Sequence, residues 1–380
     1  MDPATIAIYQ ERAEEWRQAR AEELLHARPE ELRPGSKSTL EQALALGQSR
    51  IGPGPVLDLG CGPGFHLSAL GSPAVALDAA PAMVAMATTA NSTAFGVVAD
   101  LAQLPFRFAS ASGGWASASY LHIERTALPQ ALADLHQTLV PNAPAAMKFR
   151  RGSNEGLLTG LTDEQFSGRF FAEWEPIPLR DVLEGAGFSV DYCQADSKKA
   201  DSKKADWIEV RATRAATLPD FVGPKMKVLI CGLNPSVYST ETGVGFSRPG
   251  NRFWPAALQS GLATRDRDPR HALQVHGIGM TDLVKRATVK AAEVESREYE
   301  NGMERVGRLV KWLQPKIVCF VGLAGYRQVV NKKAQCGQQP ELLGGVPVYL
   351  MPSTSGLNAN YSLKQLTDNF IQVLEMSDSK

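Results

Sequence analysis

The residues best suited to chemistry lie in residues 232–254, which read GLNPSVYSTETGVGFSRPGNRFW. Asn234 follows an apolar run, residues 227–231. Its side-chain amide can orient a water molecule but cannot take a proton from it at neutral pH. Phe246 lies further along the stretch, at a distance suited to closing over a flat ring. The pattern predicts a site that holds a planar molecule and positions water beside it, whereas Asn-Pro alone would indicate only a turn.

The elements that must position Asn234 are buried strands. KVLICGLN, KIVCFVGL and VPVYLMPS are continuous apolar runs of parallel-strand character. Residues 297–313 have apolar positions near helical spacing and precede Pro315. The alternation predicts a parallel α/β/α sandwich. Ligands of such sheets bind beyond the carboxyl ends of the strands, where Asn234, residues 322–325 and residues 352–359 should meet.

The N-terminal half carries a second ligand-binding pattern. GPVLDLGCGPGFHLSAL, residues 54–70, joins an apolar strand to a helix through a glycine-rich loop. Such a loop lets a nucleotide-like ligand approach the backbone at a helix N-terminus. Asp78 ends a second strand-like run, residues 74–77, where an acidic side chain can bind ribose hydroxyls. VVADLAQLPF, residues 97–106, places Asp100 and Leu101 at the end of another strand.

These three segments resemble motifs I, II and III of the class I S-adenosylmethionine-dependent methyltransferases, over about residues 9–214. A dinucleotide dehydrogenase is less consistent, because LDLGCGPG places its acidic residue before the glycines. The resemblance implies a Rossmann-like domain over residues 1–214 with S-adenosylmethionine as cofactor. It assigns the methionine end to Asp58, Gly60, Gly62 and Gly64, the ribose to Asp78, and the adenine to Asp100 and Leu101.

The methyl acceptor stays open. SASYLHI, residues 117–123, stands where a DNA amino-methyltransferase carries Asn/Asp-Pro-Pro-Tyr/Phe, and no cysteine follows a proline as cytosine-C5 methylation requires. A small molecule, a protein side chain or no acceptor at all are the alternatives. His122 is either a general base or a structural histidine. Two strand-like runs, FSVDYCQ and WIEVRATR, flank a duplicated DSKKA pentad, whose Lys198, Lys199, Lys203 and Lys204 either contact phosphates or form a solvated loop.

Residues 232–254 closely resemble the first motif of the mismatch-specific uracil/thymine DNA glycosylases, GINPG followed by an NRFW-like tetrapeptide. The resemblance covers residues 218–375 and implies a uracil-DNA-glycosylase fold over residues 217–376. Such enzymes hydrolyse the N-glycosidic bond of a base flipped out of duplex DNA. By this resemblance Asn234 positions the water, Phe246 stacks on the extruded pyrimidine, and Ser239 lies near the base edge or the water.

PSTSGLNANYS, residues 352–362, resembles the loop by which these glycosylases push a wedge into the duplex. Leu357 would fill the hole left by the flipped nucleotide, a role that suits an apolar side chain. Gly356 and Asn358 flank it, and Ser353 and Ser355 would bind neighbouring phosphates. The wedge has no arginine beside Leu357, so its hold on the orphan guanine is expected to differ from that of its relatives.

The base-pocket segment, GIGMTDLVKRAT at residues 277–288, contains a further departure. Asp282 stands where related enzymes place Lys or Asn. A partly desolvated carboxylate there could act as the general base that Asn234 cannot be. The alternative is that Asp282 pairs with Lys285, Arg286 or a backbone amide. The replacements of Ile by Leu233 and of Gly by Ser236 leave Asn234-Pro235 intact.

Composition limits the function classes. The 380 residues leave room for two domains. No apolar run approaches the roughly 20 residues of a membrane span, and no signal peptide is apparent, so we expect a cytoplasmic protein without membrane contact. Five scattered cysteines offer neither a disulfide framework nor a metal site. Residues 217–380 hold 20 Lys and Arg against 14 Asp and Glu, an excess that favours DNA contact.

The sequence therefore predicts an α/β protein of two three-layer αβα domains. It is expected to be a methyltransferase fused to a monofunctional DNA glycosylase, because no lysine occupies a clear nucleophile position. Its expected partner is double-stranded DNA with G·U or G·T mismatches, with uracil, thymine or adducted cytosine excised for base-excision repair. We expect a monomer, and no cofactor or metal for the glycosylase. The alternative is an S-adenosylmethionine-dependent methyltransferase carrying a lesion-binding DNA module that does not cut.

Overall fold

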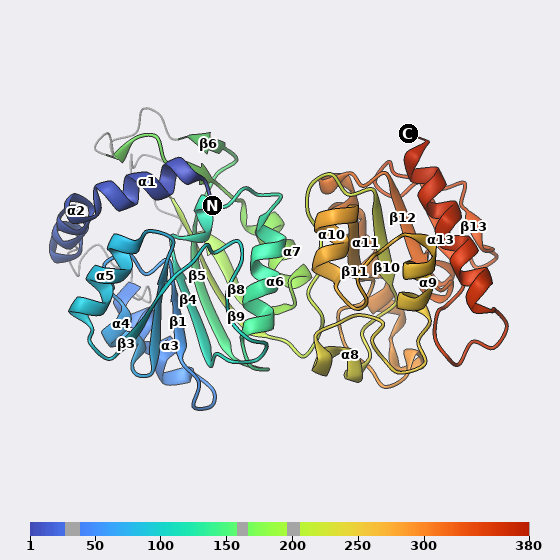
Figure 1. Cartoon of the computed structure of the whole chain (residues 1–380), viewed down its shortest axis with the longest axis horizontal. Helices are drawn as coiled ribbons and strands as arrows, with labels where there is room; N and C mark the ends of the chain where they lie inside the picture. Colours follow the sequence, from blue (N-terminus) through green and yellow to red (C-terminus); the bar gives the residue numbers. More distant parts are fainter. Residues whose placement is uncertain (27–38, 158–165, 196–205, 380) are drawn as a thin grey trace. The chain divides into compact units, whose positions relative to one another are not determined.

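The computed structural model describes residues 1–26, 39–157, 166–195 and 206–379. The chain divides into two compact units: Met1–Glu184 with Phe188–Ala215, and Gly185–Gly187 with Ala216–Lys380 (Figure 1). The four lysines of the duplicated pentad lie outside the described residues. Within the described ranges, no helix is long and apolar enough to cross a membrane.

The N-terminal unit is built on a seven-stranded sheet of order β3-β2-β1-β4-β5-β9-β8. The first five strands run parallel, and β8 and β9 form an antiparallel hairpin beside β5. This hairpin confirms the two strand-like runs expected around the pentad. The strands are β1 (Val56–Leu59), β2 (Ala74–Asp78), β3 (Ala94–Val98), β4 (Gly113–Ser117), β5 (Pro144–Arg150), β8 (Phe188–Ala195) and β9 (Trp207–Arg214), with a separate pair β6 (Glu155–Leu157) and β7 (Phe170–Ala172).

Helices cover both faces of this sheet, as neighbouring residues of β4 show. A β-carbon on Gly113 would meet Leu46 of α3, and one on Gly114 would meet Leu135 of α6. Because successive strand residues point to opposite faces, these two helices lie on opposite sides. The helices of the unit are α1 (Pro3–Glu11), α2 (Ala13–His26), α3 (Thr39–Ser49), α4 (Leu67–Leu70), α5 (Pro81–Ala90), α6 (Leu128–Thr138) and α7 (Pro176–Gly185), with a 3-10 turn at Tyr120–His122.

The C-terminal unit has a five-stranded sheet of order β11-β10-β12-β14-β13. Four strands are parallel, and the short edge strand β13 is antiparallel. The bounds are β10 (Val228–Gly232), β11 (Ile278–Asp282), β12 (Ile317–Val321), β13 (Gly337–Gln338) and β14 (Val348–Met351). The three apolar runs read from the sequence are β10, β12 and β14, which confirms them as buried parallel strands.

Alternate residues of β10 enter two different cores. Val228 and Ile230 pack in a cluster with Trp254 and Phe370, whereas Leu229 packs in a cluster with Met303, Val306 and Val310 of α11. The sheet therefore separates two helical layers. The helices are α8 (Val237–Thr242), α9 (Phe253–Ser260), α10 (Pro269–His276), α11 (Ser296–Leu313), α12 (Ala324–Val329) and α13 (Leu363–Asp378), with a 3-10 turn at Ala291–Glu293. The helix expected over residues 297–313 is α11, extended by one residue.

Candidate functional sites

Asn234 lies just beyond the carboxyl end of β10, held against the segment that follows β11. Its Nδ2 donates hydrogen bonds to Thr288 Oγ1 at 2.8 Å and to the carbonyl oxygen of Arg286 at 3.1 Å. The hydrogen bonding between β10 and β11 continues beyond the two strands as far as Leu233, whose carbonyl oxygen accepts from the Val284 amide at 2.9 Å. With its nitrogen occupied, the amide keeps its oxygen, to which no described residue donates, as the acceptor for a water hydrogen.

Asp282 ends β11 directly opposite Gly232, the last residue of β10. Its carboxylate lies over Gly232, where an added β-carbon would be 2.3 Å from Asp282 Oδ1 and 3.3 Å from Phe246 Cζ. A residue with a side chain at position 232 would therefore displace both groups. Only glycine allows the carboxylate and the aromatic ring to converge at the end of β10.

The Asp282 carboxylate has no ion pair or hydrogen bond with any described residue. Burial raises its pKa to about 6; the charges of Lys285 and Arg305 lower it, and that of Asp220 raises it further. A carboxyl group with this pKa is ionised at neutral pH, yet is a stronger base than an ordinary aspartate.

Neither cation considered as a partner for Asp282 pairs with it. Lys285 Nζ lies 2.9 Å from Asp220 Oδ1, and Arg286 Nη2 lies 2.6 Å from Glu298 Oε2. These contacts argue against a purely structural ion pair at Asp282.

Asp220 instead forms a closed ionic cluster. Arg305 Nη1 lies 2.7 Å from its Oδ2, and the Thr281 hydroxyl donates to its Oδ1 at 2.7 Å. Burial opposes the charge of Asp220, but Arg305 and Lys285 outweigh it and hold the pKa of this carboxyl below its ordinary value. The sequence analysis did not identify this cluster, whose four members come from three separate segments.

Phe246 is placed beside the carboxylate, in a strained conformation. Its ring stacks on Phe253, with centroids 4.2 Å apart and planes at 10°. Its φ of 57° lies in the left-handed region, which costs a non-glycine residue about 1 kcal/mol or more and often marks a functional position. The ring also lines a small cavity with Asp282, Met280 and Phe221. Stacking of Phe246 on an extruded base remains a prediction.

Ser239 lies inside the first turn of α8 and is 4% exposed. Ser236 caps this helix, because its hydroxyl accepts from the Ser239 amide at 3.1 Å and donates to Ser239 Oγ at 3.0 Å. A direct role of Ser239 at the base edge or the water is unsupported by these contacts. Its visible role is to fix the turn that follows Asn234.

The expected wedge loop follows β14 and presents Leu357 with 88% of its side chain exposed. Short turns shape the loop: the Ser353 hydroxyl accepts from the Ser355 amide, the Ser355 hydroxyl accepts from the Leu357 amide, and Asn358 Nδ2 donates to the Ser353 carbonyl oxygen at 2.8 Å. Gly356 comes so close to Gly250 that a β-carbon would lie 2.8 Å from the Gly250 carbonyl oxygen. Both serine hydroxyls can still donate to a phosphate.

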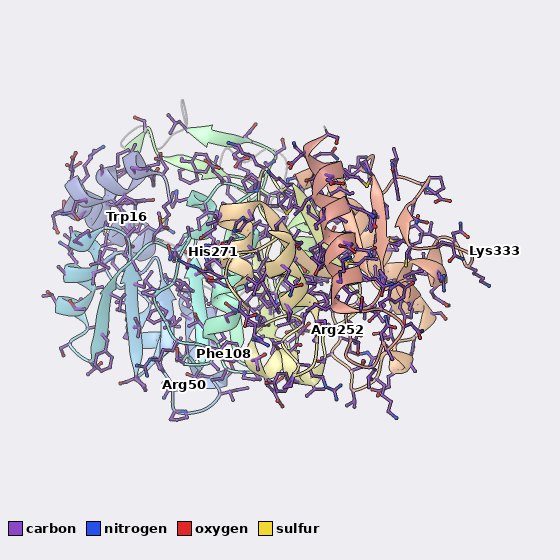
Figure 2. The ribbon with its side chains drawn as sticks, turned by 45° about the vertical axis from the view of Figure 1, so that its right-hand side comes forward. Trp16, Arg50, Phe108, Arg252, His271 and Lys333 are labelled. Atoms are coloured by element: carbon purple, nitrogen blue, oxygen red, sulfur yellow. The ribbon has the colours of Figure 1, made fainter. Side chains whose placement is uncertain are left out.

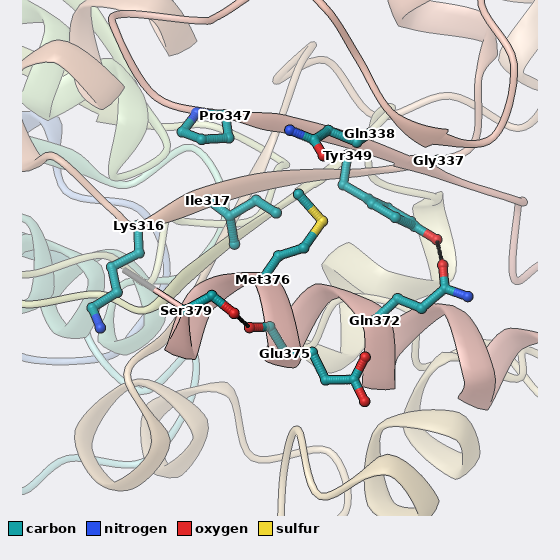
Figure 3. A pocket seen from close by; sticks show the side chains of 10 residues that line it. All are labelled: Lys316, Ile317, Gly337, Gln338, Pro347, Tyr349, Gln372, Glu375, Met376 and Ser379. Atoms are coloured by element: carbon teal, nitrogen blue, oxygen red, sulfur yellow. Dashed lines mark hydrogen bonds between the residues drawn. The ribbon is translucent and has the colours of Figure 1, made fainter.

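A larger hollow, of about 540 Å³, lies elsewhere in this domain (Figure 3). Lys316 and Ile317 at the start of β12, Pro347 before β14, and Met376 of α13 contribute to its lining. It therefore lies at the amino ends of the strands, opposite the edge that carries Asn234 and Asp282. A search for the larger of these two hollows would therefore not have selected the predicted site beside Asn234 and Asp282.

The N-terminal unit brings its glycine-rich loop and Asp58 together at the carboxyl end of β1. Gly60, Gly62 and Gly64 all have positive φ, and a β-carbon on Gly60 would lie 2.3 Å from Ser119 Cβ. Asp58 is 2% exposed, and its Oδ2 has no hydrogen-bond partner in the described structure. Burial, and then the charge of Asp78, raise the pKa of Asp58 to about 8. An orphaned carboxylate beside a glycine-lined backbone suits a cationic ligand such as the ammonium of a methionine moiety.

Asp78 and Asp100 lie at the ends of the next two strands, where the sequence places the ribose and adenine contacts. Asp78 accepts from the amides of Gly62 at 3.0 Å and Ala80 at 2.9 Å. Asp100 accepts from the Ala102 amide at 2.8 Å, and the amino group of Met1 lies 2.5 Å from its Oδ2. Leu101 is 1% exposed, so its side chain is buried. All seven predicted cofactor residues thus border one edge of the sheet.

His122 is buried and neutral rather than positioned as a free base. Its Nδ1 lies 2.7 Å from the Phe170 carbonyl oxygen, which can only accept, so Nε2 accepts from the Tyr9 hydroxyl at 2.9 Å. Burial is the main cause that lowers the pKa of His122 to about 4. These contacts favour the structural interpretation of His122. The Trp16 side chain of α2, labelled in Figure 2, lies beside the glycine loop, where a β-carbon on Gly62 would be 3.4 Å from Trp16 Cζ3.

Comparisons with known proteins agree with this division. Residues 219–375 match the model of the uracil DNA glycosylase superfamily, and residues 56–142 match that of a methyltransferase domain. Similar solved structures include an S-adenosylmethionine-dependent methyltransferase from Methanosarcina mazei, 16% identical, covering 45% of this chain and 97% of its own with a TM-score of 0.39. The 1,6-didemethyltoxoflavin-N1-methyltransferase of Burkholderia thailandensis is 19% identical, with coverages of 46% and 78% and a TM-score of 0.37. An S-adenosylmethionine-dependent methyltransferase from Mesorhizobium loti is 18% identical. The match covers 47% of this chain and 99% of that protein, with a TM-score of 0.38.

The two matched regions are separate along the chain, and each falls within one of the two compact units. The chain therefore joins a methyltransferase domain to a C-terminal domain of the uracil DNA glycosylase superfamily.

Proposed function

We propose that the C-terminal domain is a monofunctional DNA glycosylase that removes flipped-out uracil from G·U mismatches in duplex DNA and acts in base-excision repair. Thymine opposite guanine and adducted cytosine are further candidate substrates. The observation that carries this proposal is the placement of two groups at the ends of adjacent strands: Asn234, whose amide oxygen is left as an acceptor, and Asp282, whose carboxylate has no partner among the described residues.

In the proposed reaction, the extruded pyrimidine enters beside Phe246, and Asn234 accepts a hydrogen bond from the attacking water. As the glycosidic bond breaks, its electron pair leaves with the base and positive charge develops on the sugar. The water oxygen bonds to the anomeric carbon and Asp282 takes one of its protons, so the products are an abasic sugar and the base, which departs as its anion and then takes a proton from solvent. General-base assistance of this kind contributes roughly 10²–10⁴-fold to a rate.

A Schiff-base mechanism is not supported by the nearest lysine of the base-pocket segment. Lys285 Nζ lies 2.9 Å from Asp220 Oδ1 and donates to the Leu218 carbonyl oxygen, and 17% of the Lys285 side chain is exposed. An ammonium committed in this way is unsuited to attack on a sugar. Hydrolysis without strand cleavage is therefore the proposed outcome.

The N-terminal domain is proposed to bind S-adenosylmethionine through Asp58, the three glycines, Asp78, Asp100 and Leu101. The bound cofactor would supply an electrophilic methyl group, and Asp58 would hold its ammonium. The methyl acceptor is not assigned, and the buried, neutral state of His122 gives no reason to choose one.

The deciding experiment uses a fluorescent duplex with one G·U pair, enzyme in excess, and alkali to reveal abasic sites. We expect an alkali-labile site at the uracil with the wild type, none with Asn234→Ala, and wild-type activity with the matched control Asn331→Ala. Binding of the duplex without any alkali-labile site would contradict the glycosylase proposal. It would favour the alternative of a lesion-binding module attached to a methyltransferase.

A further inference from the structure

Arg252, a residue of the NRFW tetrapeptide that is labelled in Figure 2, binds the wedge loop from a neighbouring segment. We infer that Arg252 is a positioning residue that sets the loop of residues 353–361 in the conformation needed to enter duplex DNA. This inference rests on the proposed glycosylase function. It assigns a role that neither the motif nor the superfamily match assigns.

Arg252 binds the loop on both sides of Leu357. Its Nη2 donates to the carbonyl oxygens of Ser355 at 3.0 Å and Asn358 at 2.6 Å, and its Nη1 donates to that of Tyr361. The Arg252 amide also donates to the Thr354 carbonyl oxygen at 2.9 Å. A planar guanidinium with several fixed donors can hold carbonyl groups of successive turns together, which a lysine ammonium on a flexible stem cannot do.

The loop's own contacts do not fix its position on the domain. The hydrogen bonds from the Ser355 and Leu357 amides to serine hydroxyls, and from Asn358 Nδ2 to a carbonyl oxygen, all remain within residues 353–358. They shape the turns around Leu357. The ends of the loop are held by the burial of Thr354, which is 1% exposed, and by packing of Tyr361 against the core. Between these ends, Arg252 and the close approach of Gly250 to Gly356 connect the turns to the start of α9.

The direction of these hydrogen bonds suits a loop that approaches DNA. Three loop carbonyl oxygens accept hydrogen bonds from the partly buried Arg252 guanidinium, so their partial negative charges are satisfied there and do not face phosphates. The positive charge beside the loop also favours its approach to the DNA backbone. Leu357, the most exposed of the large apolar side chains among the described residues, is then left at the surface with nothing in its own domain to cover it.

One buried donor of Arg252 lacks a hydrogen bond, which costs folding free energy and calls for an explanation beyond the stability of the loop. Its Nε is buried, and no described residue accepts a hydrogen bond from it. An unpaired buried donor usually costs about 1–3 kcal/mol, and such groups call for a specific reason. Holding an apolar side chain in an exposed, insertion-ready position is such a reason.

The test is a double-mutant cycle between Arg252→Gln and Leu357→Ala, read as single-turnover excision from a G·U duplex. Glutamine removes the charge, and its shorter side chain cannot donate to the carbonyl oxygens of Ser355, Asn358 and Tyr361 at the same time. If Arg252 acts by positioning the wedge, each single variant should slow excision about 30-fold, and the double variant should be no more than about threefold slower than either single variant. Coupling of this kind between residues that act through one another is what such cycles detect.

Effects that multiply, so that the double variant is slowed several-hundredfold, would overturn the inference, as would wild-type rates for Arg252→Gln. Arg252→Lys keeps the charge and should restore less than a third of the lost rate, whereas full restoration would mean that charge alone matters. Arg248→Gln, which removes an exposed arginine from the same segment, is the matched control and should leave the rate within about twofold. A wild type that never excises uracil would instead refute the proposed function.

Discussion

Two carboxylates near the end of β11, the buried Asp220 and the partly buried Asp282, have opposite surroundings. Asp220 is enclosed by Arg305, Lys285 and Thr281, and its pKa is held low. The carboxylate of Asp282 has no hydrogen-bond or ion-pair partner among the described residues, and burial raises its pKa to about 6. The strand itself separates them, because successive residues point to opposite faces: Thr281 faces Arg305 of α11, and Asp282 faces Phe246. A satisfied acid stabilises the fold, whereas an unsatisfied one at a cavity is available for chemistry.

The largest effect expected from this comparison is on stability. Asp220→Asn should lower the free energy of unfolding by about 3–5 kcal/mol, because Arg305 and Lys285 would keep buried charges without their partner. Urea denaturation at neutral pH measures the loss. Asp368→Asn, on an exposed position of α13, should change it by less than about 0.5 kcal/mol. A small loss at Asp220 would show that the cluster is not essential to the domain.

Asp282→Asn should act on the reaction instead. We expect single-turnover excision from the G·U duplex to fall about 100-fold, or about 3 kcal/mol in activation free energy, through loss of the general base. The wild-type rate should rise with pH through about 6, where Asp282 loses its proton, and the variant should show no such rise. Equal rates of variant and wild type across this pH range would remove Asp282 from the mechanism.

The same substitution should stabilise the domain at neutral pH. The folded-state pKa of Asp282 lies above its unfolded value, so the group favours the folded state most when protonated, and this contribution is lost as the pH rises through about 6. Asp282→Asn should therefore gain about 1–3 kcal/mol at pH 7.5 and about zero below pH 4. Thermal unfolding at the two pH values provides the measurement, and a destabilised variant at pH 7.5 would mean that Asp282 has a partner.

The smallest effect extends the comparison to Asp58 in the other domain. Because burial raises the pKa of Asp58 to about 8, the carboxyl is mostly protonated at pH 7 and must ionise to pair with an ammonium. Affinity for S-adenosylmethionine should rise by up to about tenfold per pH unit between pH 6 and 8. Calorimetry should show proton release on binding, and Asp58→Asn should abolish both effects. Binding that is independent of pH would argue that the cofactor does not meet Asp58.

Much of the fold could be predicted because apolar runs and helical spacing are local signals. Residues 56–59, 228–232, 317–321 and 348–351 appear as strands where continuous apolar runs indicated them. β11 was read only as a pocket-lining segment, because IGMTD mixes small and polar residues and lacks such a run. Its strand character comes from pairing with β10, which is a long-range contact.

The candidate site was only partly predictable. The types and order of Asn234, Phe246, Asp282 and Leu357 sufficed to nominate them. The partners of Lys285 and Arg286 could not be chosen in advance, since Asp220 lies far from Lys285 in sequence and Glu298 is one of several acids near Arg286. Ser239 was nominated near the base or the water, but the structure shows it buried in a helix cap.

By itself the sequence determined that this chain has two α/β domains, a glycine-rich loop followed by acidic strand ends, and an amide in place of a base after β10. These features depend on residue type and short spacing. The three-dimensional packing shows that the Asp282 carboxylate has no partner within the described ranges, that the buried His122 binds Tyr9 and the Phe170 carbonyl oxygen, and that Arg252 binds the wedge loop. Each of those outcomes depends on which groups, distant in sequence, the fold brings within hydrogen-bonding distance of a charge or a carbonyl oxygen, and that is a property of the packed chain.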